Sequence, residues 1–188
     1  MRTTRTMRKL GEDLLADARL ARPAEAGEII AGLCAAYGRR RGGQRPVTFR
    51  FAGFPPDTAS GLWLQMADRD LLVIEEHTRP EHQLVIACHE LWHVEEGACD
   101  RHGPGPAVAA RLTGPGADLG RLLGADAGLG GVVRQAAARA AGEDPAEIQA
   151  ETFGLYLGKI LKTFLPAPCE EQFPEAIERI KTSFGWGR

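Results

Sequence analysis

Hydrophobic positions recur at helical spacing near both ends of the chain. Leu10 and Leu14 share one face of a segment that spans residues 9–20, as expected for a short amphipathic helix. Residues 24–37 and 174–184 show the same period. The pattern therefore predicts two N-terminal helices and one helix close to the C-terminus.

The pattern changes to strand-like segments in three places, residues 47–51, 61–66 and 71–76. Alternating apolar and polar side chains are typical of strands with one buried face. The connections are short, and Asp68 to Asp70 form a tight turn. Three consecutive strands with such connections predict an antiparallel meander. We therefore expect an α+β fold: a mainly helical single domain with a small three-stranded antiparallel sheet packed beside the helix described next.

Two longer helices are marked by their ends. One runs from Pro80 to about residue 96, with Pro80 in the first turn and Gly97 as its C-terminal stop. The other covers residues 144–164 and begins with an Asp-Pro pair, a common helix start. An alanine-rich stretch at residues 128–141 predicts a further helix.

The length of 188 residues fits one domain. Residues 1–8 are polar and basic and are expected to form a flexible N-terminal tail. Residues 9–188 would then form the single domain. Within it, residues 100–131 are interrupted by glycine and proline and are interpreted as an irregular insertion or a lid.

Composition narrows the function classes. The net charge of −2 argues against a surface that binds nucleic acid directly and against one that binds a membrane. The run Arg39-Arg40-Arg41 could contact phosphate, but a helix C-terminus followed by Gly42 is the favoured interpretation. No apolar run approaches the length of a membrane span, and no signal peptide is recognised. The four cysteines lack a C-x-x-C spacing and are interpreted as free thiols, which indicates a cytoplasmic protein.

The most informative stretch is His89-Glu90-Leu91-Trp92-His93, an H-E-x-x-H pattern. On a helix, His89 and His93 lie one turn apart on the same face, so their imidazoles can converge on one metal ion. Glu90 lies about 100° further round the helix and suits a general base that is not a ligand. The flanking residues are almost all apolar, and buried polar groups in such a setting are usually paired or bound to metal.

A catalytic zinc ion usually takes a third protein ligand and leaves one position for water. The helix at residues 144–164 offers Glu147 and Glu151, one turn apart. Glu147 could instead complete a capping box with Asp144, and Glu151 could lie on a solvated face. The small residues Ala150 and Gly154 would permit close approach to the H-E-x-x-H helix. The sequence leaves Glu147 and Glu151 open as alternatives.

Taken together, the two segments resemble the ImmA/IrrE family of metallopeptidases. The family pattern is H-E-L-x-H, followed downstream by E-x-x-A-(N/D)-x-F-A, and the resemblance covers roughly residues 25–165. It implies zinc ligands at His89, His93 and Glu147, with Glu90 as the base. The chain departs from the pattern at Glu151, where the family has Asn or Asp, and at Gly154, where it has Ala.

The resemblance also implies a function. It predicts a cytoplasmic zinc-dependent endopeptidase that cleaves a partner transcriptional regulator or antitoxin, a helix-turn-helix protein, as in the compact subgroup described as toxin components of toxin–antitoxin pairs. The alternative is a non-catalytic zinc-binding component that acts by binding its partner. His82, Tyr156 and His102 are weak candidates for stabilising an oxyanion. The oligomeric state is not determined by the sequence.

Overall fold

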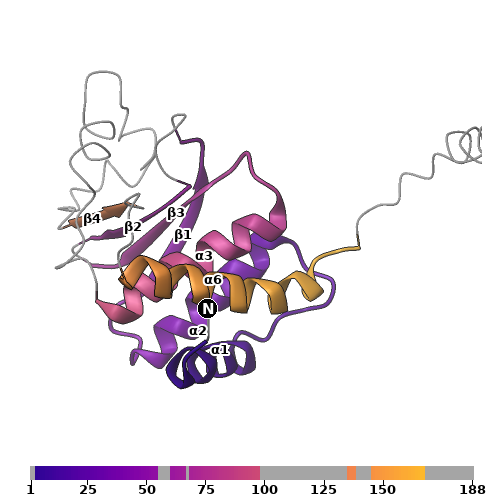
Figure 1. The fold of residues 1–188 in the computed structure, drawn as a ribbon, viewed down its shortest axis with the longest axis horizontal. Coiled ribbons are helices and arrows are strands. Elements are labelled where there is room, and N and C mark those ends of the chain that lie inside the picture. Colours follow the sequence, from indigo (N-terminus) through magenta and orange to yellow (C-terminus); the bar gives the residue numbers. More distant parts are fainter. Residues whose placement is uncertain (1–2, 55–59, 67, 98–134, 139–144, 168–188) are drawn as a thin grey trace, which may run out of the picture.

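The computed structural model describes residues 3–54, 60–66, 68–97, 135–138 and 145–167. They form a mixed α/β arrangement (Figure 1). The helices are α1 (Arg5–Asp17), α2 (Ala26–Arg40), α3 (Pro80–Glu96), α6 (Pro145–Leu161) and the 3₁₀-helix η3 (Lys162–Phe164), and the strands are β1 (Val47–Ala52), β2 (Gly61–Gln65), β3 (Asp70–Glu75) and β4 (Gln135–Ala138).

Two predictions about local structure are wrong. Residues 5–8 are not part of a tail, because α1 begins at Arg5 and the Thr4 hydroxyl accepts a hydrogen bond from the Met7 amide at 3.2 Å. Residues 135–138 form a strand, whereas a helix was expected across residues 128–141. The expected lid at residues 100–131 and the expected helix at residues 174–184 lie outside the described residues.

The sheet is mixed, which corrects the expected antiparallel meander. Its strand order is β1-β3-β2-β4, with β1 parallel to β3 and β2 antiparallel to both β3 and β4. β3 therefore lies between the two strands that precede it in the chain. Its sequence explains this position, because Leu71 to Ile74 form a continuous apolar run buried to 0–1% exposure. Such runs are typical of central strands that are covered on both faces.

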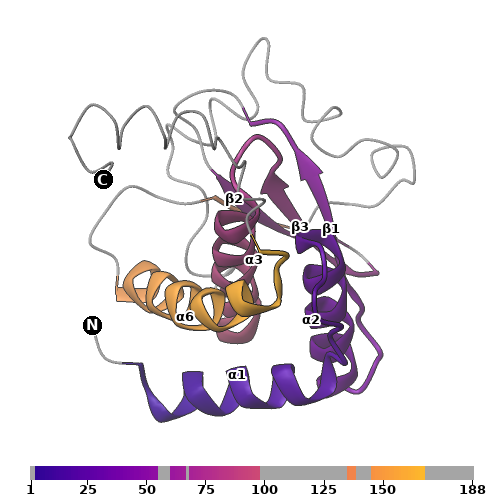
Figure 2. The ribbon, with the colours of Figure 1, turned by 90° about the vertical axis from the view of Figure 1, so that its right-hand side faces the viewer.

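The helices lie on one side of the sheet (Figures 1 and 2). α3 lies next to β2 and β3, and α6 crosses α3 on the side away from the sheet (Figure 2). The hydrophobic core joins these layers through side chains such as Trp63 and Ile74 of the sheet, Trp92 of α3 and Phe153 of α6. The rings of Trp92 and Phe153 lie 5.1 Å apart between centroids. α3 is thus held between the sheet and α6.

A buried carboxylate fixes the start of β3. Asp70 is fully buried, and its two oxygens accept hydrogen bonds from Arg45 at 3.0 and 3.1 Å. Arg41 donates to it at 2.8 Å and the Trp63 indole at 3.1 Å. A buried charge with this many partners is well satisfied. The network links the end of α2, the segment before β1, and strands β2 and β3.

The three consecutive arginines at the end of α2 form ion pairs with carboxylates of the same chain. Arg39 pairs with Asp17 at 2.7 Å, Arg40 with Glu95 at 2.9 Å and Arg41 with Asp70 at 2.8 Å. These ion pairs, each made by a different carboxylate, favour the helix C-terminus interpretation over a phosphate contact.

Candidate metal centre

Helix α3 presents the H-E-x-x-H residues to the interior. It begins at Pro80 and ends at Gly97, whose φ of 61° is the left-handed conformation that glycine adopts readily at helix ends. Both predicted ends are confirmed. His89, Glu90 and His93 are 3%, 3% and 4% exposed. Three polar side chains this deeply buried require partners, since an unpaired buried polar group costs free energy.

Helix α6 approaches α3 unusually closely because of two glycines. A β-carbon at residue 154 would lie 2.9 Å from the Val85 carbonyl oxygen, and one at residue 158 would lie 2.6 Å from Val85 Cγ2. Gly154 also faces His89, whose Cβ would be 3.3 Å away. Side chains at these positions would push the helices apart. The glycines therefore set the spacing that brings the first turn of α6 to the two histidines.

Glu147 completes a three-residue cluster with His89 and His93. The two Nε2 atoms lie 3.0 Å apart, and each lies 3.4 Å from a different oxygen of Glu147. Bonds of about 2.0–2.2 Å around a tetrahedral zinc ion separate the ligand atoms by roughly 3.3–3.6 Å. The two nitrogen–oxygen distances match this separation, and the nitrogen–nitrogen distance is about 0.3 Å shorter. The group could bind a metal ion.

The ionisation of Glu147 suits this role. Burial by itself would raise its pKa, but hydrogen bonds and charge interactions with His89 and His93 outweigh burial and lower the pKa to about 2. The carboxylate is therefore ionised at neutral pH, which is the form that binds metal. Both of its oxygens face the imidazoles, so in this structure the side chain is turned towards the cluster.

The structure separates the two carboxylates that the sequence left as alternatives. Glu147 has 12% of its side chain exposed and lies at the cluster. Glu151, one turn further along α6, is exposed and is not part of it. The proposed capping role of Glu147 involves Asp144, which lies outside the described residues.

The carboxylate of Glu90 extends to the start of β2. A β-carbon at residue 61 would lie 2.5 Å from Glu90 Oε1 and 2.6 Å from Ile86 Cγ2. A β-carbon at this position would therefore displace the Glu90 carboxylate and the Ile86 methyl group. Gly61 therefore helps to place the expected general base, a role that sequence reasoning missed. The available signal was a glycine at the first position of an otherwise bulky strand.

The other candidates do not join the cluster. His82 is exposed, two turns before His89 on α3. Tyr156 packs towards α1, where its ring would lie 3.0 Å from a β-carbon at residue 11. Cys88 is a free, fully buried thiol whose pKa is raised by burial, and Cys34 is likewise free and buried. The third oxyanion candidate, His102, and the other two cysteines, Cys99 and Cys169, lie outside the described residues.

Comparisons of the chain with protein-family models, curated proteins and solved structures find no match. Among the described residues, no helix combines the length and apolar character needed to cross a membrane. The geometry of His89, His93, Glu147 and Glu90 is therefore the basis for inferring a function.

We expect Glu147→Gln to weaken zinc binding by at least about 10- to 100-fold, the loss known for disturbing even an outer-shell partner of a metal site. An amide oxygen carries no full charge to offset the metal ion. The matched control is Glu151→Gln, the same change one turn away, which should bind zinc like the wild type. Competition with a chromogenic chelator measures both affinities. Equal losses in the two variants would contradict the assignment of Glu147.

Proposed function

We propose that the protein is a zinc-dependent endopeptidase that cleaves a partner transcriptional regulator or antitoxin. The observation that carries the proposal is the buried cluster of His89, His93 and Glu147, with Glu90 next to His89 on the same helix. Two imidazole nitrogens and one carboxylate are a donor set used by catalytic zinc in peptidases. The class of partner comes from the resemblance to the ImmA/IrrE pattern.

Each residue then has a defined role. His89, His93 and Glu147 would hold the ion, and bound zinc would supply Lewis-acid activation of water and of the scissile carbonyl. Glu90 would accept the proton of the attacking water and deliver it to the leaving amine. Its buried position beside Gly61 keeps the carboxylate in one place, and low exposure strengthens its electrostatic interactions.

The sheet limits where a peptide substrate could bind. An extended peptide commonly adds to the open edge of a sheet. β2, the strand next to Glu90, is paired with β3 on one side and β4 on the other. Within the described strands the outer positions belong to β1 and β4. A substrate that pairs with the sheet near the site would therefore add to β4 or replace it.

A non-catalytic role is the second candidate, and the burial of Glu90 favours it. A side chain that is 3% exposed is accessible to substrate only if neighbouring groups move. In this alternative the zinc ion stabilises the packing of α3 against α6, and the protein acts by binding its partner. Removing the metal ion would lower the stability of the protein under either candidate function. A cleavage activity would be lost only if the protein is a peptidase.

The test is cleavage of a candidate helix-turn-helix partner with and without metal. The purified protein should contain about one zinc ion per chain, as one tetrahedral site predicts, and should cut the partner into discrete fragments resolved by mass spectrometry. Chelation should stop cleavage, and added zinc should restore it. A zinc-loaded protein that binds the partner without cutting it would support the non-catalytic role. A chain that binds no zinc would exclude both candidates.

A further inference from the structure

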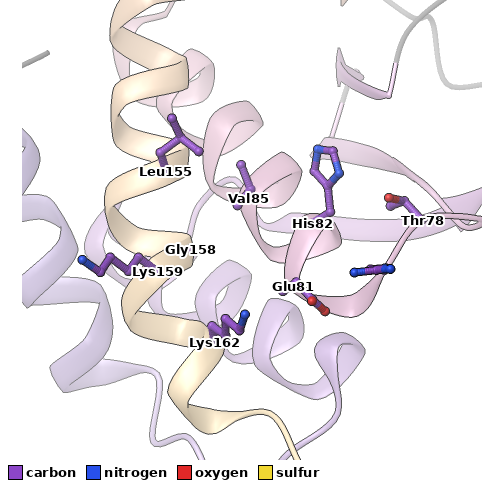
Figure 3. Close-up of a pocket in the computed structure, with 9 residues that line it drawn as sticks. Thr78, Glu81, His82, Val85, Leu155, Gly158, Lys159 and Lys162 are labelled. Carbon is purple, nitrogen blue, oxygen red and sulfur yellow. The ribbon is translucent and has the colours of Figure 1, made fainter. Parts of the chain in front are cut away.

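A hollow lies on the same pair of helices, away from the metal cluster. It has a volume of about 640 Å³ and is formed by the first turns of α3 and the last turns of α6 (Figure 3). From α3 and the residues before it come Thr78, Arg79, Glu81, His82 and Val85, and from α6 and η3 come Leu155, Gly158, Lys159 and Lys162. We call this hollow the α3–α6 groove. Its floor exists because Gly158 lacks a side chain where α6 crosses Val85.

The α3–α6 groove is cationic although the chain carries a net charge of −2. Arg79, Lys159 and Lys162 line it together with a single carboxylate, Glu81. Within the described part of the chain, none of these three cations forms an ion pair, in contrast to the arginines at the end of α2. Lys162 extends towards α3, and Lys159 extends to the other side of α6 (Figure 3). The positive charges of Arg79 and Lys162 are thus available to a ligand in the groove.

The α3–α6 groove also exposes an apolar side chain. Leu155 is 53% exposed, and Ile148, two turns earlier on α6, is 42% exposed; they are the large hydrophobic residues that the described surface presents to solvent. Leu155 also borders a second hollow of about 670 Å³ on the α1 side of α6. An exposed apolar residue beside unpaired cations is characteristic of a binding surface for a peptide that carries both kinds of group.

We propose that the α3–α6 groove binds an acidic segment of a partner protein that places an apolar side chain against Leu155. The cations attract and orient the segment, and Leu155 with Val85 buries its apolar residue. The proposal is independent of the proposed peptidase activity, because no groove residue belongs to the metal cluster. If both hold, the groove anchors the partner on the helices that form the metal site.

The test uses a fluorescent synthetic peptide of glutamate and leucine in a helical repeat, and measures its binding to the full chain by anisotropy. The double variant Arg79→Glu and Lys162→Glu should weaken binding by at least about tenfold, because two attractive exposed contacts become repulsive. Leu155→Ser should weaken it by a few-fold. Higher salt should weaken binding to the wild type, as for any exposed charge contact.

The matched control is Arg8→Glu with Lys9→Glu, the same charge change on the exposed face of α1, which should bind like the wild type. Circular dichroism verifies that each variant is folded. Equal binding by the groove variant and the wild type would overturn the proposal. So would tighter peptide binding after Glu175→Lys and Glu178→Lys in the full chain, because the chain's own acidic C-terminal segment would then be the occupant.

Discussion

Glu90→Gln is expected to keep zinc bound and to reduce cleavage of the partner by about 10²- to 10⁴-fold, the usual contribution of a positioned acid–base group. Glutamine has nearly the same shape, so it fits beside Gly61, where space is restricted. It cannot accept a proton from water at neutral pH. Structure and metal content should therefore be preserved while the chemical step is lost.

Zinc content by elemental analysis and the rate of partner cleavage are the two measurements. The matched control is Glu96→Gln, the same change on the exposed end of α3. This variant should retain both the zinc content and the cleavage rate of the wild type. Full cleavage by the Glu90 variant would remove Glu90 from the mechanism. Full biological effect without any cleavage would instead identify the non-catalytic role.

Asp70→Ala should lower the free energy of unfolding by about 3–5 kcal/mol, the cost of removing one partner of a buried ion pair. The change leaves Arg45 and Arg41 without the carboxylate that they share, and it removes the acceptor of the Trp63 indole. The two arginine side chains are 21% and 33% exposed, so water can satisfy them in part, which places the expected value near 3 kcal/mol.

Urea denaturation followed by tryptophan fluorescence measures this loss. Asp68→Ala is the control, since Asp68 is an exposed aspartate in the same turn and pairs with Arg69 at 3.1 Å. Asp68→Ala should lower the free energy of unfolding by less than about 1 kcal/mol, as for other surface ion pairs. Similar values for the two variants would show that the buried network does not hold β3 in place.

Helices α3 and α6 were predictable because residues at their own ends mark their boundaries. Pro80 and Gly97 mark the ends of α3, and Pro145 marks the start of α6. These residues act through fixed or permissive backbone angles, which need no distant partner. The positions of His89 and His93 on one face of α3 follow from the same regular geometry.

Strand order was not predictable from the short connections alone. Consecutive strands pair more often than not, yet β3 lies between β1 and β2. The continuous apolar run of β3 was a signal of a central position, because both of its faces are buried. The strand at residues 135–138 had no such signal. Its sequence, Gln-Ala-Ala-Ala, favours a helix, and pairing with β2 overrides that preference.

The sequence by itself determined the helix that carries His89, Glu90 and His93, and the pair of carboxylates from which a third ligand could come. Only the tertiary structure shows which of these carboxylates lies at the imidazoles. Gly154 and Gly158 let α6 cross α3 at backbone contact, and that crossing places Glu147 at the imidazoles and leaves Glu151 exposed. Glu147 and Glu151 are one turn apart and look equivalent in the sequence of α6. They differ in the structure because only the turn that carries Glu147 lies at the two imidazoles of α3.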